Sequence, residues 1–169
     1  MEEVLVSGVA YDKDQAKVTL QGVPDKPGLA ARIFGPLAEA GIVIDIIVQN
    51  VGADGRTDLT FTVHANDLKA TIANVNQMAG ELGVRGVRTS EKVGKVSVVG
   101  LGMRNHAGVA ARMFELLAGE GINIQMISTS EIKISVVVDV EAVDRAVNVL
   151  HKAFIGGQAA VRSGAGMSA

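Results

Sequence analysis

The sequence contains an internal repeat. When residues 28–50 are placed over residues 108–130, at an offset of 80, 11 of the 23 positions are identical. The identical pairs are Gly28/Gly108, Ala30/Ala110, Ala31/Ala111, Arg32/Arg112, Phe34/Phe114, Leu37/Leu117, Ala38/Ala118, Gly41/Gly121, Ile42/Ile122, Ile44/Ile124 and Ile47/Ile127. Upstream, KVTLQG at 17–22 matches KVSVVG at 95–100, at an offset of 78. A repeat of this length predicts two similar domains.

Each copy has the pattern of a strand, a loop, a helix and a second strand. Alternating β-branched residues at 17–22 favour a strand, and DKPG at 25–28 is typical of a turn. Apolar residues at 30, 33, 34 and 37 have helical spacing, although Pro36 should remove a hydrogen bond or kink the helix. Gly41 and Gly121 are expected at left-handed helix ends.

Further elements complete a βαββαβ order, which is the ferredoxin-like arrangement with an antiparallel sheet. Second helices are expected at 66–82, with Asn66 or Asp67 as N-cap, and at 141–154. GVRGVRTSEKV supplies the fourth strand of the first copy, but the second copy lacks one. The strand at 4–12 can fill that place, so we expect an α+β chain with the first domain inserted in the second. The expected divisions are 16–92, 1–15 plus 93–156, and a flexible tail at 157–169.

Two of the strands are apolar on both faces. IVIDIIVQN at 42–50 and SVVVDV at 135–140 would each need cover on both sides, whereas helices cover only one face of such a sheet. We therefore expect sheet-face or edge-to-edge association between the domains, between chains, or both. The alternative is an exposed apolar sheet face.

Composition and charge exclude several classes of function. Net charge is −2, with mixed signs along the chain, so no basic field for nucleic acid or for a membrane surface is present. The absence of cysteine excludes disulfides, thiolate metal sites and cysteine nucleophiles. The N-terminus is acidic and no apolar run approaches 18 residues, so we expect a cytoplasmic protein.

Catalytic and cofactor motifs are not found. His64, His106 and His151 lack metal-ligand spacing. VVGLGMRNHAG at 98–108 has its third glycine displaced from the dinucleotide-binding pattern. An acylphosphatase would share the fold, but the arginine of its phosphate loop is replaced here by Lys26-Pro27, and lysine does not replace a bidentate arginine. No catalytic residue, metal site or cofactor is predicted.

The loop before the first helix is the remaining candidate site. Pro27 suits a first helical turn, and Gly28 lets a ligand approach the backbone. Free N–H groups of Gly28, Leu29 and Ala30 would favour a carboxylate at the positive helix end. Asp25 offers a counter-charge for an ammonium, and Gln49 and Asn50 end the neighbouring strand with amides. An amino acid would suit this site. The alternative is that Asp25 is a turn former and Gly28 a packing residue.

The repeated segments DKPGLAARIFGPLAEAGIVID and GVAARMFELLAGEGINIQMISTSEIKISV closely resemble the tandem ACT domains of aspartokinases, over nearly the whole chain to about residue 155. In that family an N-terminal strand completes the second ACT domain. Some members make the regulatory region as a separate subunit starting at an internal methionine, and MEEVLVSGVA resembles such a start. The kinase's KFGG-type catalytic motif is missing, so the resemblance implies a regulatory chain without catalytic power.

The family's effector contacts, carried over by position, are Asp25, Lys26, Pro27, Gly28, Leu29, Ala30 and Gln49 in the first domain. Asn123, Ile124 and Gln125 would face them from the second domain of another chain. Asp45 stands where lysine-sensing relatives hold the effector's ε-ammonium. The loop of the second domain has Asn105 in place of an acid, so no equivalent site is expected there.

The resemblance implies feedback inhibition by L-threonine, L-lysine or both, and it implies three partners: an amino-acid effector, the catalytic (alpha) subunit of aspartate kinase, and a second copy of the chain. We expect L-threonine at the Asp25/Gln49 site, with L-lysine requiring the catalytic subunit. Two alternatives stay open: a free-standing tandem ACT sensor of another target, and an acylphosphatase-like hydrolase.

Overall fold

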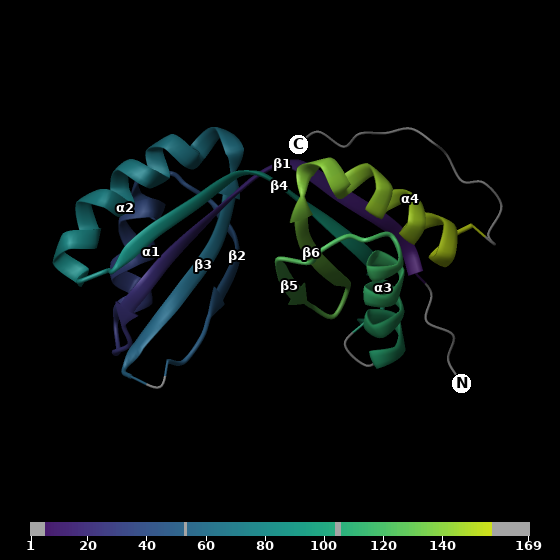
Figure 1. The fold of residues 1–169 in the computed structure, drawn as a ribbon, viewed down its shortest axis with the longest axis horizontal. Coiled ribbons are helices and arrows are strands. Elements are labelled where there is room, and N and C mark those ends of the chain that lie inside the picture. The colour runs from purple at the N-terminus through teal and green to yellow at the C-terminus, as the bar shows by residue number, and fades with distance from the viewer. Residues whose placement is uncertain (1–5, 53, 104–105, 157–169) are drawn as a thin grey trace.

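Two α+β units are joined by two long strands in the computed structural model of the chain (Figure 1), which describes residues 6–52, 54–103 and 106–156. The strands form one six-stranded sheet in the order β2-β3-β1-β4-β6-β5, and every neighbouring pair is antiparallel. The flexible tail expected at 157–169, the expected strand residues 4 and 5, and Asn105 lie outside the described residues.

The elements alternate as the repeat predicts. In chain order they are β1 (Val6–Pro24), α1 (Leu29–Glu39), β2 (Ile44–Gln49), β3 (Arg56–His64), η1 (Ala65–Asp67), α2 (Leu68–Leu82), β4 (Gly86–Gly100), α3 (Ala107–Gly119), β5 (Met126–Thr129), β6 (Lys133–Asp139), η3 (Val140–Ala142) and α4 (Val143–Phe154). Asp67 is the N-cap of α2, and Gly41 and Gly121 have φ angles of 76° and 68°, as expected. Pro36 lies inside α1.

The strands β1 and β4 each belong to both units. The second half of β1 pairs with β3, and the second half of β4 pairs with β6, while β1 and β4 pair with each other along their lengths. Val6 is opposite Gly100 and Asp12 is opposite Lys95, so the N-terminal part of β1 completes the sheet of the second unit. This confirms that the first unit, which contains α1, β2, β3 and α2, is inserted within the second.

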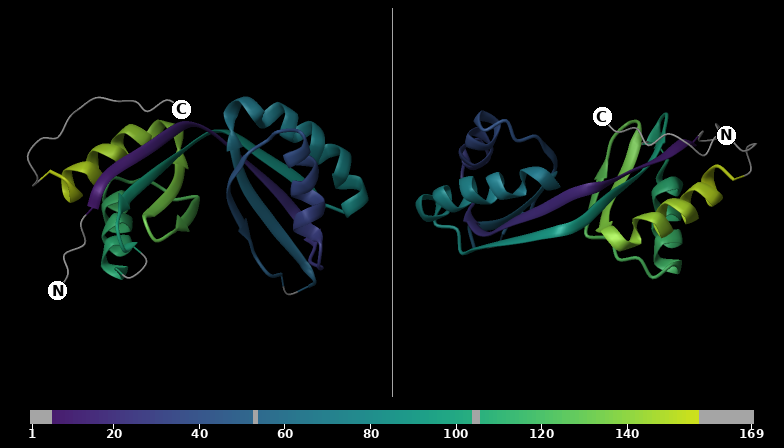
Figure 2. Two further views of the ribbon diagram at one scale, coloured as in Figure 1. Left: turned by 180° about the vertical axis from the view of Figure 1, so that it is seen from behind. Right: turned by 90° about the horizontal axis from the view of Figure 1, so that it is seen from above.

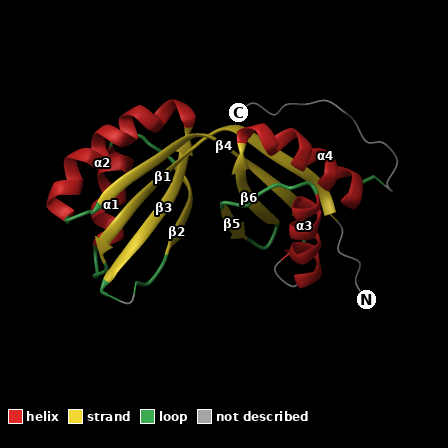
Figure 3. Cartoon of the chain, viewed as in Figure 1, coloured by secondary structure: helices red, strands yellow, loops and turns green. Residues whose placement is uncertain are grey.

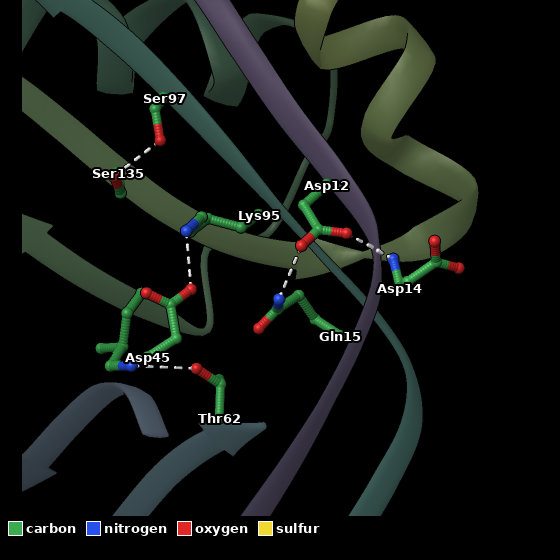
Figure 4. A network of polar contacts seen from close by, with 9 residues as sticks. Asp12, Asp14, Gln15, Asp45, Thr62, Lys95, Ser97 and Ser135 are labelled. Carbon is green, nitrogen blue, oxygen red and sulfur yellow. Dashed lines mark hydrogen bonds and ion pairs between the residues drawn. The ribbon is translucent and has the colours of Figure 1, made fainter. Parts of the chain in front are cut away.

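The continuity of the two strands was not predicted, because the residue patterns at 4–12 and 17–22 indicate separate strands. No loop separates them. Instead, the register between β1 and β4 shifts on both sides of Gln15. Asp12 accepts hydrogen bonds from the Asp14 N–H (2.8 Å) and from Gln15 Nε2 (2.8 Å), as Figure 4 shows. Such irregularities bend and twist a strand without ending it, and both strands run through both units (Figure 2).

Close packing holds α4 of the second unit against β1 and β4, near the place where their register shifts. A Cβ added to Gly94 would collide with the Val143 side chain of α4 and would make a tight contact with the Asp12 carbonyl oxygen. Lys13 forms an ion pair with Asp144 of α4 (2.7 Å), and the hydrogen bond to this carboxylate raises the pKa of the Lys13 ammonium. No described helix is long and apolar enough to span a membrane.

Each unit has its own apolar core between its helices and one face of its sheet. In the first unit Val18, Leu20 and Phe61 face Ile33 and Leu37, and Phe34 meets Phe61 edge-on with ring centroids 5.2 Å apart. The second unit has an equivalent core, made mainly by Val96, Val98, Ile134, Val136, Met113, Leu117 and Leu150. The helices lie on the outer sides of the molecule, and β2 and β5 face each other near its centre (Figure 3).

A third apolar cluster lies on the helix-free side and joins the units. It contains Ile46 of β2, Met126 of β5, Val137 of β6 and Val93 of β4, with Val48 packed against it. Because β2 belongs to the first unit and β5 to the second, the helix-free sheet faces pack on each other within one chain. The expected sheet-face association between the domains is therefore observed.

The buried hydroxyl pair Ser97–Ser135 tests how this side of the sheet is stabilised. The two residues are cross-strand partners, 3% and 2% exposed, and their Oγ atoms are 2.6 Å apart (Figure 4). We expect Ser97→Ala or Ser135→Ala alone to lower the free energy of unfolding by about 1–3 kcal/mol, because each leaves one buried hydroxyl unpaired. The double variant should recover most of that loss in denaturant titrations. Additive losses in the double variant would contradict this account.

Candidate functional site

The loop between β1 and α1 is a tight turn that starts the first helix. The Leu29 N–H donates to the Lys26 carbonyl (3.2 Å), and Gly28 has φ 89° and ψ −6°. A hydrogen bond over three residues, with Pro27 second and a left-handed Gly28 third, is a type II turn. The Asp25 N–H donates to the Gly55 carbonyl (2.9 Å), which fastens the turn to the β2–β3 connection.

This geometry corrects two expectations about the loop. Leu29 is buried and its N–H is already bonded to Lys26, so it is not a free donor at the helix end. Pro27 precedes the N-cap Gly28 and so lies outside the first turn of α1. Asp25, Lys26, Gly28 and Ala30 are exposed residues. At most two of the three expected N–H donors, those of Gly28 and Ala30, are therefore left for a ligand, since the first N–H groups of a helix have no partner within it.

Asp45 and Gln49 lie in the edge strand β2 but have different surroundings. Gln49 is exposed at the end of the strand, opposite Leu59. The register of β2 against β3 shifts between Ile44 and Ile47, so Asp45 and Ile46 occupy a bulge. Neighbouring residues of a regular strand point to opposite faces. The bulge instead lets both contact the second unit: Ile46 joins the inter-unit apolar cluster, and Asp45 accepts a hydrogen bond from Lys95 Nζ (2.6 Å).

The candidate residues of the second unit precede β5. Asn123 is exposed and Ile124 half-buried, while the Gln125 side chain is held on both sides. Gln125 Oε1 accepts from Lys17 Nζ (2.5 Å) and Gln125 Nε2 donates to Asp139 Oδ1 (2.7 Å). The amide of Gln125 is therefore oriented by a cation from the first unit and a carboxylate from its own unit.

A cavity of about 480 Å³ lies between the units. It is lined by Lys17, Thr19, Val48, Asn50, Thr60, Ile124, Gln125, Met126 and Ile127. The structure thus brings two predicted residues, Ile124 and Gln125, beside the sheet of the first unit. None of the residues of the Asp25–Ala30 loop lines this cavity, and Gln49 and Asn123 do not line it either.

Lys17 and Lys95 were missed in the sequence. They are equivalent in the repeat (95 − 17 = 78), and each follows a run of charged and polar residues that is typical of a solvent-facing strand end. Their shared position at the start of KVTLQG and KVSVVG was the available signal. Among the described residues, no group of three or more His, Asp or Glu side chains could hold a metal ion.

The equivalent glycines Gly28 and Gly108 give a test of the turn. Gly28 has a positive φ and open space around it, whereas Gly108 lies within α3, also with open space. We expect Gly28→Ala to lower the free energy of unfolding by about 1–2 kcal/mol, the cost of a left-handed alanine. Gly108→Ala, the matched control, should raise it by up to about 1 kcal/mol, because alanine favours a helix. Equal effects in thermal unfolding would contradict the assigned turn.

Comparisons with known proteins agree with this architecture. Residues 17–80 and residues 96–154 each match an ACT domain family. Aspartate kinase from Pseudomonas fluorescens (strain SBW25) is 54% identical over 154 residues, which make up 91% of this chain and 37% of that protein. Aspartokinase from Helicobacter pylori (strain ATCC 700392 / 26695) is 47% identical over 154 residues, 91% of this chain and 38% of that protein. The chain therefore spans well under half the length of these relatives.

Two solved structures match over almost their whole chains. A chain in the crystal structure of aspartokinase alpha and beta subunits is 51% identical, with a TM-score of 0.82, covering 88% of this chain and 98% of that one. The ligand-free regulatory subunit of aspartate kinase from Thermus thermophilus is 39% identical, with a TM-score of 0.84, covering 89% of this chain and 99% of that one. The chain therefore belongs to the family of tandem ACT-domain proteins that includes the regulatory subunits of aspartate kinase.

Proposed function

We propose that this chain is the regulatory part of an aspartate kinase, and that it binds an end-product amino acid and mediates feedback inhibition. The observation that carries the proposal is the match, at 51% identity and over 98% of its length, to a chain of the aspartokinase alpha and beta subunit structure. The catalytic step, ATP-dependent phosphorylation of L-aspartate, would belong to a separate catalytic region or alpha subunit.

L-threonine is the proposed effector, with L-lysine as the alternative. The α-carboxylate would lie at the start of α1, where the helix dipole and the first N–H groups of the helix, beside the exposed residues Gly28 and Ala30, favour an anion. Asp25 would balance the α-ammonium, and the Gln49 amide would complete the site. Asn123, Ile124 and Gln125 of a second copy would close it, since these residues and the loop do not line a common cavity within one chain.

A second copy is supported by the two sheet edges. Ile47 of β2 and Ile127 of β5 are equivalent in the repeat, and they are 50% and 47% exposed on the strands at the two ends of the sheet order. Exposed apolar edge strands are templates for pairing with another chain. In the proposed homodimer, the first ACT domain of one chain lies beside the second ACT domain of the other.

Regulation would follow from a change in how the ACT domains pack. An effector that contacts both domains binds one packing more tightly, and it shifts the population toward that packing. Couplings of this kind are typically about 1–3 kcal/mol, which correspond to roughly 5- to 150-fold in affinity.

If the chain dimerises through the edge strand β2, a charge placed on that strand should prevent dimerisation. Ile47→Lys should convert the chain to a monomer in sedimentation velocity runs, because it adds a charge to the apolar edge of β2. The control is Ala70→Lys, at an exposed position of α2 away from both edges. A dimer that persists in Ile47→Lys would contradict pairing through this strand.

Isothermal titration with L-threonine and, separately, L-lysine tests the function itself. We expect saturable L-threonine binding, reduced at least about tenfold in Asp25→Ala and in Gln49→Ala, because each loses a charged or hydrogen-bonded ligand contact. Asp54→Ala is the control, since this exposed carboxylate in the β2–β3 connection is not among the proposed ligands.

Absence of binding to the chain both alone and after mixing with an aspartate kinase catalytic subunit would contradict the proposal. Binding that persists unchanged in both Asp25→Ala and Gln49→Ala would contradict the proposed site but not the proposed function.

A further inference from the structure

The contacts between the helix-free faces of the two ACT domains follow the internal repeat. Lys17 Nζ of the first domain donates to Gln125 Oε1 of the second. In the other direction, Lys95 Nζ of the second domain donates to Asp45 Oδ2 of the first at 2.6 Å (Figure 4). The two lysines are repeat equivalents (95 − 17 = 78), and so are their two partners (125 − 45 = 80). The interface therefore has two equivalent parts, which we call the Lys17 half and the Lys95 half.

A pair of hydroxyl side chains lies in each half. Thr19 and Thr60 are cross-strand partners of the first domain, with Oγ1 atoms 3.0 Å apart. Ser97 and Ser135 are the corresponding partners of the second domain, and both are buried. The threonines are instead half-buried, and they line the cavity of about 480 Å³ between the domains. The Lys95 half is thus closed at its hydroxyl pair, whereas the Lys17 half is open there, even though threonine is the larger residue.

The two halves also differ in charge. The Lys95 ammonium is paired with the Asp45 carboxylate. Lys17 bonds instead to the neutral amide of Gln125, whose Nε2 in turn donates to Asp139. None of the described residues that line the cavity is an aspartate or a glutamate. An ammonium has three donors and Gln125 uses one of those of Lys17, so an anion in the cavity would be the complement of this half.

The remaining lining residues set the kind of anion. The Thr19–Thr60 bond uses one of the two hydroxyl hydrogens and leaves the other for a ligand, and Asn50 adds an amide. Val48, Met126 and two isoleucines supply aliphatic walls. Small-molecule sites typically combine such walls with a few polar groups that fix the orientation of the ligand. The lining therefore fits a molecule with a carboxylate, a short aliphatic chain and one hydroxyl or carbonyl group.

We propose that this cavity is a second ligand site, which binds a small aliphatic hydroxy or oxo monocarboxylate. The ligand carboxylate accepts hydrogen bonds from the Lys17 ammonium, and its hydroxyl or carbonyl group meets the Thr19–Thr60 pair or Asn50. A zwitterionic amino acid does not suit the cavity, because the lining offers no carboxylate to an α-ammonium that has lost its water.

This site is separate from the proposed effector site. The two share Ile124 and Gln125, but neither Gln49 nor any residue of the 25–30 loop lines the cavity. The inference therefore goes beyond the proposed function and does not rest on it. A ligand in the cavity contacts β1, β2 and β3 of the first domain and β5 of the second, so it favours the domain packing in which all these contacts exist.

Titrations with 3-hydroxybutyrate and L-threonine, followed by NMR of the methionine methyl groups, test the proposal. These probes share a carbon chain, a carboxylate and a 3-hydroxyl group, and they differ only in the α-ammonium. Both titrations use the Asp25→Ala variant, in which the proposed effector site is impaired. We expect 3-hydroxybutyrate to shift the signal of Met126, which lines the cavity, and not that of Met113, which lies in the core of the second domain. L-threonine should bind at Met126 at least about tenfold more weakly.

A charge variant and its control locate the anion. Lys17→Met should lower the affinity for 3-hydroxybutyrate at least about tenfold, because it removes the cation from the cavity. Lys92→Met is the matched control, since it removes an exposed lysine of β4 that does not line the cavity, and it should leave the affinity unchanged. Thr60→Val, which keeps the shape of the side chain, serves if Lys17→Met does not fold, and it should weaken binding about threefold or more.

Several results would overturn the proposal. One is an unmoved Met126 signal at about 50 mM 3-hydroxybutyrate, a concentration far above a millimolar Kd. Others are equal affinities in Lys17→Met and Lys92→Met, or an equal shift with sodium chloride, which would show a general effect of ionic strength. Tighter binding of L-threonine than of 3-hydroxybutyrate at Met126 would overturn the assigned ligand class. None of these results bears on the proposed function, because Asp25→Ala lacks the acid of the proposed effector site.

Discussion

The two strands that pass through both ACT domains constrain everything else in the molecule. Because β1 and β4 each continue from the sheet of one domain into the sheet of the other, two paired strands join the domains. The domains are therefore not connected by a flexible linker. A change in the relative packing of the domains requires β1 and β4 to bend between the two sheets, near Gln15. The register of these strands shifts there, and Gly94 leaves no room for a side chain.

The helix-free faces meet through a small apolar cluster and a few polar bonds. Four buried residues form the cluster, and Lys95–Asp45 and Lys17–Gln125 bridge the domains beside it. Each domain has a far larger core of its own between helices and sheet. The contact between domains is thus weaker than the domains themselves, as a two-state regulatory element requires.

Local features were predictable from the sequence, whereas contacts between the domains were not. The repeat, the glycine helix ends at Gly41 and Gly121 and the missing fourth strand followed from residue patterns, because turns, caps and periodicity are local properties. The continuity of β1 through Gln15 was not predicted, because the charged residues around Gln15 are typical of a loop. Lys95 was missed as a partner of Asp45 because a polar residue at an alternate strand position is usually solvent-facing, and 50 positions separate the two.

A measured distance between the ACT domains tests the account most directly. The chain contains no cysteine, so Gln77→Cys on α2 and Lys152→Cys on α4 would carry the only two spin labels, both at exposed positions. We expect saturating L-threonine to change the distribution of distances between the labels, because the proposed effector would select one packing of the domains. Demonstrated L-threonine binding with an unchanged distribution would contradict it.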